Sequence, residues 1–254
     1  MVRHYHGHLS GVYAVKLHPT LDILVTAGRD AVARVWDMRS KTQIHCLSGH
    51  EHTVTSVLTA AVHPQIITAS HDATVKLWDL AAGKCFTTLT HHSKSVRGLA
   101  DAAGRERSFV SASADGTIRK WQGKNGKFLK AMRRTEETKT TAAARSALIW
   151  NTVAVQEDGV MVTGSDDGAL DFWDYDTGYC FQQSQAKVQP GSLAQSESGI
   201  LCSAFDKTGT RLVTGHADKS IQIWRQDEEA SAISHPIDTE GWEKTCRARA
   251  LEQY

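Results

Sequence analysis

Apolar and polar residues alternate with a period of two in five short stretches of the chain, and each stretch ends at or just after a tryptophan. The first stretch, residues 24–37, reads LVTAGRDAVARVWD. Short alternating runs rich in Val, Ile and Thr are typical of β-strands with one buried face. The pattern therefore predicts an all-β array of repeats. The four related stretches are residues 66–79, 109–122, 161–174 and 212–225.

The five tryptophans set the period of this array. Successive spacings between Trp36, Trp78, Trp121, Trp173 and Trp224 are 42, 43, 52 and 51 residues. A period of about 40–45 residues is typical of one four-stranded propeller blade per repeat. The sequence thus predicts five four-stranded blades of a β-propeller, with each inner strand facing a central channel. The two longer spacings predict insertions, one between Phe128 and Asn151 and one over residues 187–199.

The domain organisation follows from this repeat. Residues 7–228 are predicted to form the propeller repeats. Residues 1–6 occupy the position of an outermost strand, which belongs either to a preceding blade or to the last blade if the ring closes on itself. Residues 229–254 are predicted to be a loosely attached tail with mixed charge.

Charge and cysteine content narrow the function classes. The 254 residues carry 29 basic and 28 acidic side chains, so no global field draws the protein onto nucleic acid or an acidic membrane. Five cysteines without a CxxC spacing argue against a disulfide framework or a zinc knuckle. The chain has no secretory leader pattern and no apolar run near 18 residues. We expect a soluble intracellular protein without a membrane segment.

A histidine, a hydroxyl, a carboxylate and a tryptophan recur in each of the first three repeats. Such a set could form a hydrolase triad, but its repetition predicts a buried hydrogen-bond network instead, and so no enzyme. The last two repeats keep the hydroxyl, carboxylate and tryptophan without a matching opening histidine, so we expect them to be held less rigidly. The predicted structural residues are His8, Thr26, Asp30, Trp36, His50, Thr68, Asp72, Trp78, His92, Ser111, Asp115, Trp121, Thr163, Asp167, Trp173, Thr214, Asp218 and Trp224.

Two weaker sequence patterns bear on metal binding and on RNA binding. His4, His6 and His8 alternate along the chain and could bind a transition metal from one face, but His8 already belongs to the network, so no metal is predicted. Phosphate-binding glycine loops are absent, and no cofactor is expected. A peripheral RNA contact could involve Trp150 with the basic residues of the first insertion, although a solvated charged loop is favoured. These basic residues are Arg133, Arg134, Lys139 and Arg145.

Partner-binding residues are predicted at one end of the repeats. The residue after the first valine of each inner strand and the residue before the network aspartate should be exposed around the channel. These positions are Tyr13, Thr55 and Arg97, and Arg29, His71 and Asp166.

The combination of Gly-His, Asp and Trp-Asp at this period resembles the WD40 repeat over residues 7–225. More narrowly, HPTLD followed by GRDAVARVWD, together with VQPGSL, resembles the pleiotropic regulator family of splicing factors associated with the NineTeen complex. The resemblance implies a nuclear, spliceosomal scaffold that docks proteins such as a Myb-domain cell-division-cycle-like factor. It implies neither a membrane nor a small-molecule substrate.

The chain also departs from that family. Family members have a long N-terminal region and seven blades, whereas five repeats are recognisable here. We therefore expect an open arc that lacks the first two blades, as in a fragment, and hold a closed five-bladed ring as the alternative. A different function is a substrate-recognition subunit of a cullin-type ubiquitin ligase, in which Arg29 and Arg97 would grip an acidic or phosphorylated peptide.

Overall fold

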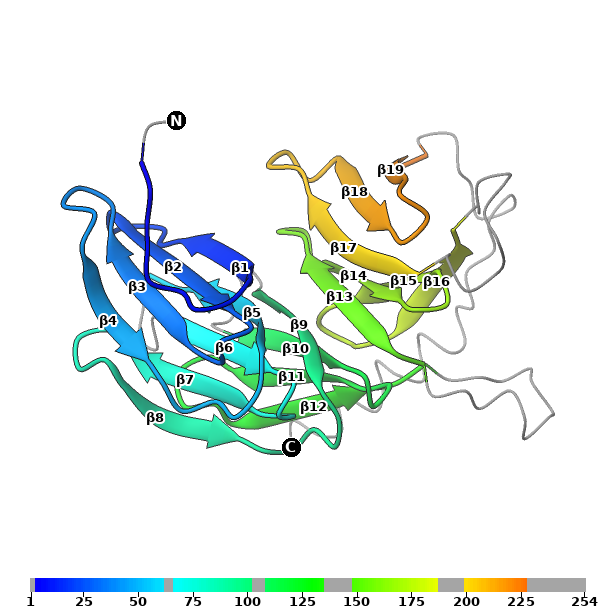
Figure 1. Ribbon diagram of the computed structural model, residues 1–254. Helices are drawn as coiled ribbons and strands as arrows, with labels where there is room; N and C mark the ends of the chain where they lie inside the picture. The colour runs from blue at the N-terminus through cyan, green and yellow to red at the C-terminus, as the bar shows by residue number, and fades with distance from the viewer. Residues whose placement is uncertain (1–2, 62–65, 102–107, 135–147, 187–198, 228–254) are drawn as a thin grey trace. The chain divides into compact units, whose positions relative to one another are not determined.

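The computed structural model describes residues 3–61, 66–101, 108–134, 148–186 and 199–227. Within these ranges all regular secondary structure is β, with nineteen strands in five antiparallel sheets (Figure 1). None of the described residues forms a helix that is long and apolar enough to cross a membrane. The all-β prediction is thereby confirmed. The chain divides into two compact units, the first with sheets 1 to 3 and the second with sheets 4 and 5.

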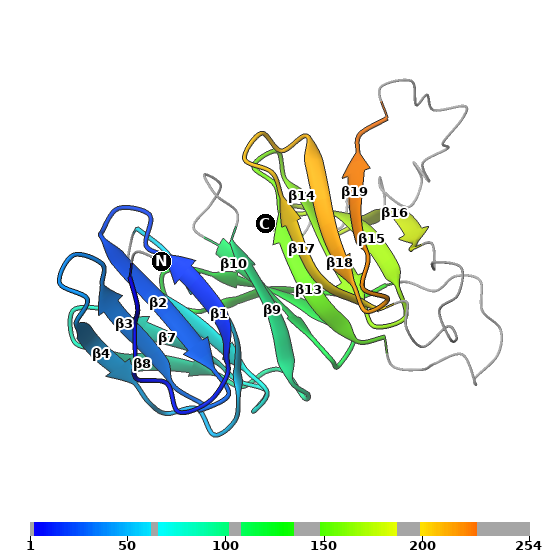
Figure 2. The same cartoon turned by 45° about the horizontal axis from the view of Figure 1, so that its top comes forward.

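Each sheet is a meander in which strands that follow one another along the chain lie side by side, as Figure 2 shows for β1 to β4. Sheet 1 comprises β1 (Val12–Leu17), β2 (Ile23–Gly28), β3 (Ala33–Asp37) and β4 (Gln43–Leu47). Sheet 2 comprises β5 (Val54–Thr59), β6 (Ile66–Ser70), β7 (Val75–Asp79) and β8 (Lys84–Leu89). Sheet 3 comprises β9 (Val96–Asp101), β10 (Ser108–Ser113), β11 (Ile118–Gln122) and β12 (Phe128–Met132).

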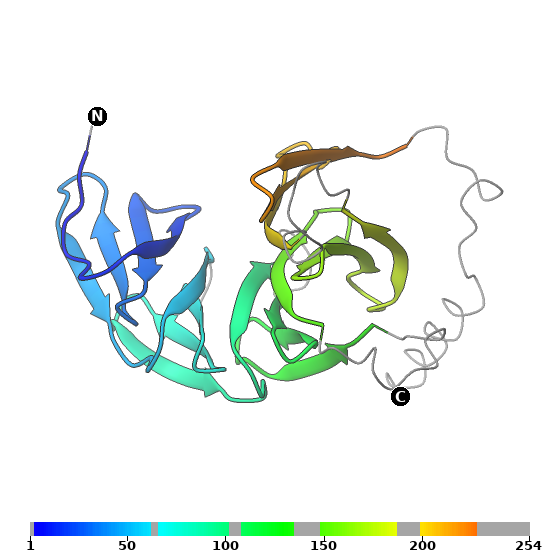
Figure 3. The same ribbon diagram turned by 45° about the vertical axis from the view of Figure 1, so that its right-hand side comes forward.

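The second unit continues the same topology. Sheet 4 comprises β13 (Trp150–Val155), β14 (Val160–Ser165), β15 (Ala169–Asp174) and β16 (Cys180–Gln185). Sheet 5, yellow to orange in Figure 3, has three strands within the described residues. They are β17 (Ile200–Phe205), β18 (Arg211–His216) and β19 (Ile221–Arg225).

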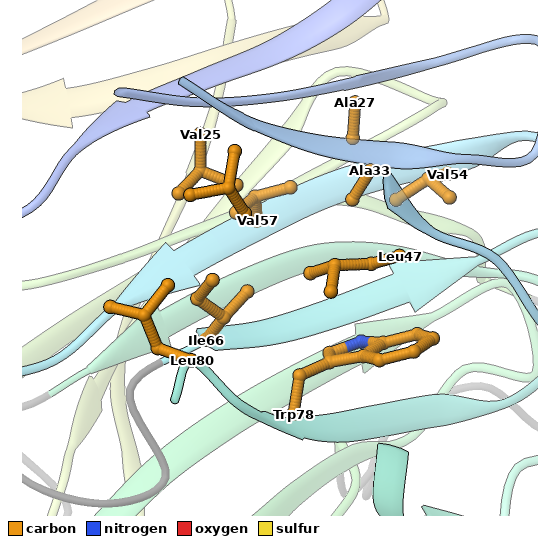
Figure 4. Packing of buried hydrophobic residues seen from close by; sticks show 10 residues of the cluster. Val25, Ala27, Ala33, Leu47, Val54, Val57, Ile66, Trp78 and Leu80 are labelled. Carbon is orange, nitrogen blue, oxygen red and sulfur yellow. The ribbon is translucent and has the colours of Figure 1, made fainter. Parts of the chain in front are cut away.

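Each sheet has two chemically different faces. We call the face with the network hydroxyl and tryptophan the front face, and the opposite one the back face. The back face of sheet 1 packs against the front face of sheet 2, where Leu47 lies beside the indole of Trp78 and Val25 near Val57 (Figure 4). The back of sheet 2 meets the front of sheet 3 around Trp121 in the same way. Sheets 4 and 5 repeat the arrangement in the second unit.

A tight turn follows every network aspartate, and one residue in it has a left-handed backbone. Glycine adopts this conformation freely, whereas another residue costs about 1–2 kcal/mol there. Glycine fills the position in sheets 3 and 4 only. The five residues, with their φ angles, are Ala31 (60°), Ala73 (64°), Gly116 (76°), Gly168 (83°) and Lys219 (67°).

The structure differs from the sequence prediction at two places. Residues 3–6, expected to be an outer strand, lie outside any strand, and Tyr5 instead packs against Trp36 with ring centroids 5.6 Å apart. The first insertion was predicted to start after Phe128, but Phe128–Met132 is strand β12, so the inserted segment is shorter. The second insertion except Gly199, and the predicted tail, lie outside the described residues.

Candidate functional site

The predicted network of the first repeat forms a continuous chain of hydrogen bonds. The Trp36 indole N–H donates to Thr26 Oγ1 at 2.8 Å, and His8 Nε2 lies 2.8 Å from the same oxygen. His8 Nδ1 lies 2.8 Å from Asp30 Oδ2. Because β2 and β3 pair Leu24 with Trp36, the sheet register itself holds the tryptophan and the hydroxyl together.

Sheets 2 and 3 repeat this geometry closely. In sheet 2 the Trp–hydroxyl, His–hydroxyl and His–carboxylate distances are 2.8, 2.7 and 2.8 Å, among Trp78, Thr68, His50 and Asp72. In sheet 3 they are 2.8, 2.7 and 3.1 Å, among Trp121, Ser111, His92 and Asp115. Three equivalent buried copies are structural clamps, because each hydroxyl is already shared between a tryptophan and a histidine.

The charges of the clamp are fixed by its surroundings. Burial alone would raise the pKa of Asp72, but hydrogen bonds from Thr74 and His50 hold that pKa below its usual value. Desolvation lowers the pKa of His50, against the opposing effect of Asp72. A neutral imidazole next to an ionised carboxylate therefore describes the clamp of sheet 2 at neutral pH.

Sheet 5 keeps the clamp with a histidine from another position. Trp224 Nε1 donates to Thr214 Oγ1 at 2.9 Å, and His216 Nε2 lies 2.8 Å from the same oxygen. His216 occupies the place taken by Ser70 and Ser113 in sheets 2 and 3. A histidine thus reaches this hydroxyl although no opening histidine precedes the sheet, and the residue that supplies it is the second after Thr214.

Sheet 4 has a second indole beside its tryptophan. Trp173 Nε1 donates to Thr163 Oγ1 at 2.9 Å, and Asp167 accepts from Ser165. Trp150 is fully buried, with its ring centroid 6.2 Å from that of Trp173. This corrects the prediction that Trp150 could stack on RNA bases.

Sheet 4 also contains a buried carboxylate that has no hydrogen bond. Asp171 on β15 is fully buried, neither oxygen has a hydrogen bond, and Oδ2 lies 3.8 Å from Arg134 Nε. Burial raises the pKa of Asp171 to about 6, although Arg134 acts in the opposite direction. Arg134 also donates to Gln183 Oε1 at 2.7 Å. Arg134, which follows β12, is thus bound to sheet 4 and is not available as a phosphate contact.

The predicted partner-binding residues at the start of the inner strands lie in β-bulges. In sheet 1 the register shifts between Val12 and Ala14, which re-aims Tyr13. The same shift occurs in all five sheets. The five bulge residues are Tyr13, Thr55, Arg97, Asn151 and Leu201.

The residue before each network aspartate lies beside a bulge. Its backbone N–H bonds to the chain just ahead of the inner strand, as from Arg29 to Gly11 O at 2.9 Å, from His71 to Thr53 O at 3.0 Å and from Asp166 to Ile149 O at 3.0 Å. We call these positions and the bulge residues together the bulge end. It is described separately for each unit.

In the first unit the bulge end is exposed and basic. Tyr13, Arg29 and His71 are exposed, and Arg97 is partly buried. Desolvation lowers the pKa of His71, with further contributions from the positive charges of Arg97 and His52. Thr55 was predicted to be available to a partner. Instead, its hydroxyl donates to Val96 O at 2.7 Å and Ala69 O at 3.1 Å.

In the second unit the bulge end has a different character. Asp166 is exposed, as predicted, and its Oδ1 accepts from Asn151 Nδ2 at 3.0 Å. Leu201 was not predicted, although it follows Ile200 just as Tyr13 follows Val12. Its side chain is 58% exposed, which leaves a large apolar group in solvent.

The histidines considered as metal ligands do not come together in one site. The rings of His4 and His6 stack at 6.0 Å, while His8 belongs to the clamp of sheet 1. Within the part of the chain that the structure describes, no group of three His, Cys, Asp or Glu side chains is placed to hold a metal ion. Arg133 is exposed, and Lys139 and Arg145 lie outside the described residues.

The chain matches the family model "WD domain, G-beta repeat" over residues 1–37, 41–79, 83–122 and 187–225. These residues include strands of sheets 1, 2, 3 and 5, which are the sheets with a clamp histidine. Sheet 4 lies outside the matched residues.

Relatives were found by comparison with curated proteins. The chain is 49% identical to "Protein pleiotropic regulator PRL2" of Arabidopsis thaliana over 145 residues, which is 57% of this chain and 28% of that protein. It is 48% identical to human "Pleiotropic regulator 1" over 133 residues, 52% of this chain and 23% of that protein. It is 45% identical to "Pre-mRNA-splicing factor PRP46" of Candida glabrata over 131 residues, 52% of this chain and 28% of that protein. The chain thus spans roughly a quarter of the length of these relatives.

Proposed function

The chain belongs to the WD-repeat family, and from this premise we propose that it is a non-enzymatic protein-interaction scaffold in pre-mRNA splicing. The observation that carries the proposal is the 45–49% identity to proteins named as pleiotropic regulators and as a pre-mRNA-splicing factor. These names favour a splicing scaffold over a ubiquitin ligase subunit.

The use of the polar groups supports a scaffold. In sheets 1 to 3 every repeated histidine and hydroxyl is joined to the other and to a tryptophan or carboxylate of the same sheet. A triad needs a hydroxyl that can reach a substrate, whereas these hydroxyls are buried. The repeats thus offer a rigid frame, and the groups left for recognition lie at the bulge end.

We assign partner binding to the bulge end of the first unit. Tyr13 supplies an exposed aromatic surface, and Arg29 supplies an exposed guanidinium group suited to carboxylates. The partners proposed are spliceosomal proteins, among them a Myb-domain cell-division-cycle-like factor and other components of a NineTeen-type complex. A nuclear location and at most a peripheral RNA contact, to which exposed Arg133 could contribute, belong to the same proposal.

Affinity purification of the tagged full chain from nuclear extract tests this function. Spliceosomal proteins should co-purify and be depleted with the Arg29→Glu variant, which reverses a charge at the bulge end. Arg39→Glu is the matched control, since the Arg39 side chain is 80% exposed and forms a surface ion pair with Asp22. Recovery of cullin adaptors without spliceosomal proteins would contradict the proposal.

A further inference from the structure

A row of exposed apolar side chains follows the outermost strands of the first unit. β4, β8 and β12 are the last strands of their sheets, and among the described strands each pairs with one neighbour only. Ile44, Phe86 and Leu129 each lie three residues before the buried last residue of their strand. Their exposed fractions are 43%, 43% and 45%. Because position and exposure agree in three sheets, the exposed apolar residue is a feature of the repeat.

A β-bulge determines how this residue is presented. The register of β3 and β4 shifts at Trp36 and skips Ile44. The register of β7 and β8 shifts at Trp78 and skips Phe86. A bulge changes the direction in which such a side chain points. Each of these two sheets thus holds a large apolar group at a fixed position on its surface.

The three outermost strands lie next to one another within this unit (Figure 1). A Cβ added to Gly83, in the turn before β8, would lie 2.6 Å from Nδ1 of His45 on β4. A Cβ added to Gly126, in the turn before β12, would lie 3.0 Å from Leu89 on β8. The apolar row therefore lies on one continuous surface. We call residues 38–47, 80–89 and 123–131 together the outer edge.

The outer edge is strongly basic. Lys84 and Lys127 are exposed and lie two residues before Phe86 and Leu129. The corresponding residues 175–185 of sheet 4 contain Asp176 and no Lys or Arg. The outer edge has no Asp or Glu and has six basic residues, which are Arg39, Lys41, Lys84, Lys124, Lys127 and Lys130.

A further basic side chain reaches the outer edge from the third strand of each sheet. Arg34, Lys76 and Arg119 all lie opposite the clamp hydroxyl in the register. Each side chain contacts the outermost strand of its own sheet, as in the hydrogen bond of 2.6 Å from Arg34 Nη1 to Gln43 Oε1. Sheet 4 has Asp171 at this position. Positive charge thus accompanies the apolar row throughout the first unit.

We propose that the outer edge binds an acidic segment of a partner protein, whose large apolar side chains pack on Ile44, Phe86 and Leu129. Its carboxylates face the surrounding Lys and Arg side chains. Charge complementarity identifies the segment as acidic, and the exposed apolar row requires apolar side chains to cover it. The outer edge is separate from the bulge end, because inner and outermost strands are opposite edges of each sheet.

Single-stranded RNA fits this surface less well, although its phosphates are also anionic. Ile44 and Leu129 are aliphatic and do not offer the aromatic ring on which a base stacks. The Phe128 ring already stacks on His91 with centroids 5.7 Å apart, and Arg119 Cζ lies 5.9 Å from its centroid. A protein segment can cover the whole apolar row, whereas RNA would leave its aliphatic members in water.

The test selects short peptides from a random-sequence display library on the full chain and measures their affinities by fluorescence anisotropy. Selected peptides should be rich in Asp and Glu and contain large apolar residues. Phe86→Ser and Leu129→Ser should each weaken their binding at least about tenfold, because a central apolar contact is lost. Leu21→Ser is the matched control, since Leu21 is 45% exposed in the turn between β1 and β2. It should bind like the wild type.

Charge is tested with the same peptides. Lys84→Glu should weaken binding most at low salt, where charges are least screened. Lys16→Glu, at an exposed position on β1, is its control and should have no effect. Arg29→Glu at the bulge end should also leave these affinities unchanged, so this proposal and the proposed function can fail independently. Circular dichroism shows whether each variant is folded.

Several results would overturn the proposal. One is a library that gives no binding peptide, or only neutral and basic ones. Another is a set of acidic peptides whose affinities are unchanged by Phe86→Ser and Leu129→Ser in folded chains. Binding of single-stranded oligouridylate that is lost in these two variants would show that the outer edge takes RNA instead.

Discussion

Thr68 connects two buried side chains at once, and this double use explains why the same residue types recur in the repeats. Its oxygen accepts from Trp78 Nε1, and its hydroxyl proton can be donated to His50 Nε2. His50 Nδ1–H then faces Asp72, whose carboxylate is ionised. One neutral imidazole thereby satisfies the whole chain of groups, in agreement with the lowered pKa of His50.

Thr68→Val removes this connection without changing the shape of the side chain. It leaves the Trp78 N–H and the His50 ring nitrogen without their buried partner, at a cost of about 1–3 kcal/mol for each group. We expect the free energy of unfolding in urea to fall by about 2–4 kcal/mol. Thr88→Val on β8 is the control, because Thr88 is exposed and its loss should change stability by less than about 0.5 kcal/mol. Equal effects of the two substitutions would contradict the clamp.

Asp171 gives a stability effect with the opposite dependence on pH from that of the clamp aspartates. Its pKa is raised to about 6, so between pH 4 and 6 the folded state holds a proton that the unfolded chain releases. Stability therefore falls as pH rises through this window, by about 3 kcal/mol.

Asp171→Asn removes this titration. Relative to the wild type, the variant should gain stability steadily from pH 4 to pH 6, and the difference should become constant above that range. Urea unfolding at several pH values measures it. Because the clamp aspartates are present in both proteins, they cancel in the difference. A constant difference across the window would show that Asp171 does not titrate there.

The strands were predictable because alternation and turn residues act locally, whereas the bulges were not. Every inner strand contains an extra residue, a β-bulge, at its second position. The bulge changes the direction in which the side chain of that residue points. The sequence therefore located Tyr13 and Thr55 at equivalent positions but could not tell that Thr55 would be used by two backbone carbonyls. That outcome depends on the adjacent strand β9, which is distant in sequence.

Substitutions inside the repeats were misjudged for a related reason. His216 reaches the clamp hydroxyl from strand β18 rather than from the loop before the inner strand. A search of the sequence for Gly-His finds only a clamp histidine that lies in the loop before the inner strand. The buried pairing of Asp171 with Arg134 likewise joins residues 37 positions apart, and neither carries a local signal.

The approach of β2 to the start of β1 makes a prediction about an element. A Cβ at Gly28 would lie 2.2 Å from the Gly11 carbonyl oxygen, so Gly28→Ala must displace backbone. We expect it to lower the free energy of unfolding by about 2 kcal/mol. Gly11→Ala is the matched control, since its Cβ would meet no atom within 4 Å. A Gly28→Ala variant as stable as that control would show that the two segments are not in contact.

At the scale of the whole molecule, the repeats separate stability from recognition. The clamps lie within the sheets, and the apolar faces lie between them. Both are buried, so binding of a partner should not affect them. The bulge ends carry exposed aromatic and basic groups, among them Tyr13 and Arg29. Substitutions in the clamps and apolar faces should therefore change the free energy of unfolding, whereas substitutions at the bulge ends should change partner binding.

The most direct test of this account is quantitative mass spectrometry of proteins bound to the tagged chain, carried out together with melting curves for Arg29→Glu and Thr68→Val. We predict that Arg29→Glu loses spliceosomal partners while its melting temperature stays that of the wild type. Thr68→Val should melt lower yet retain those partners at temperatures where it is folded. Undiminished spliceosomal binding by Arg29→Glu, or no spliceosomal partner for the wild type, would contradict the account.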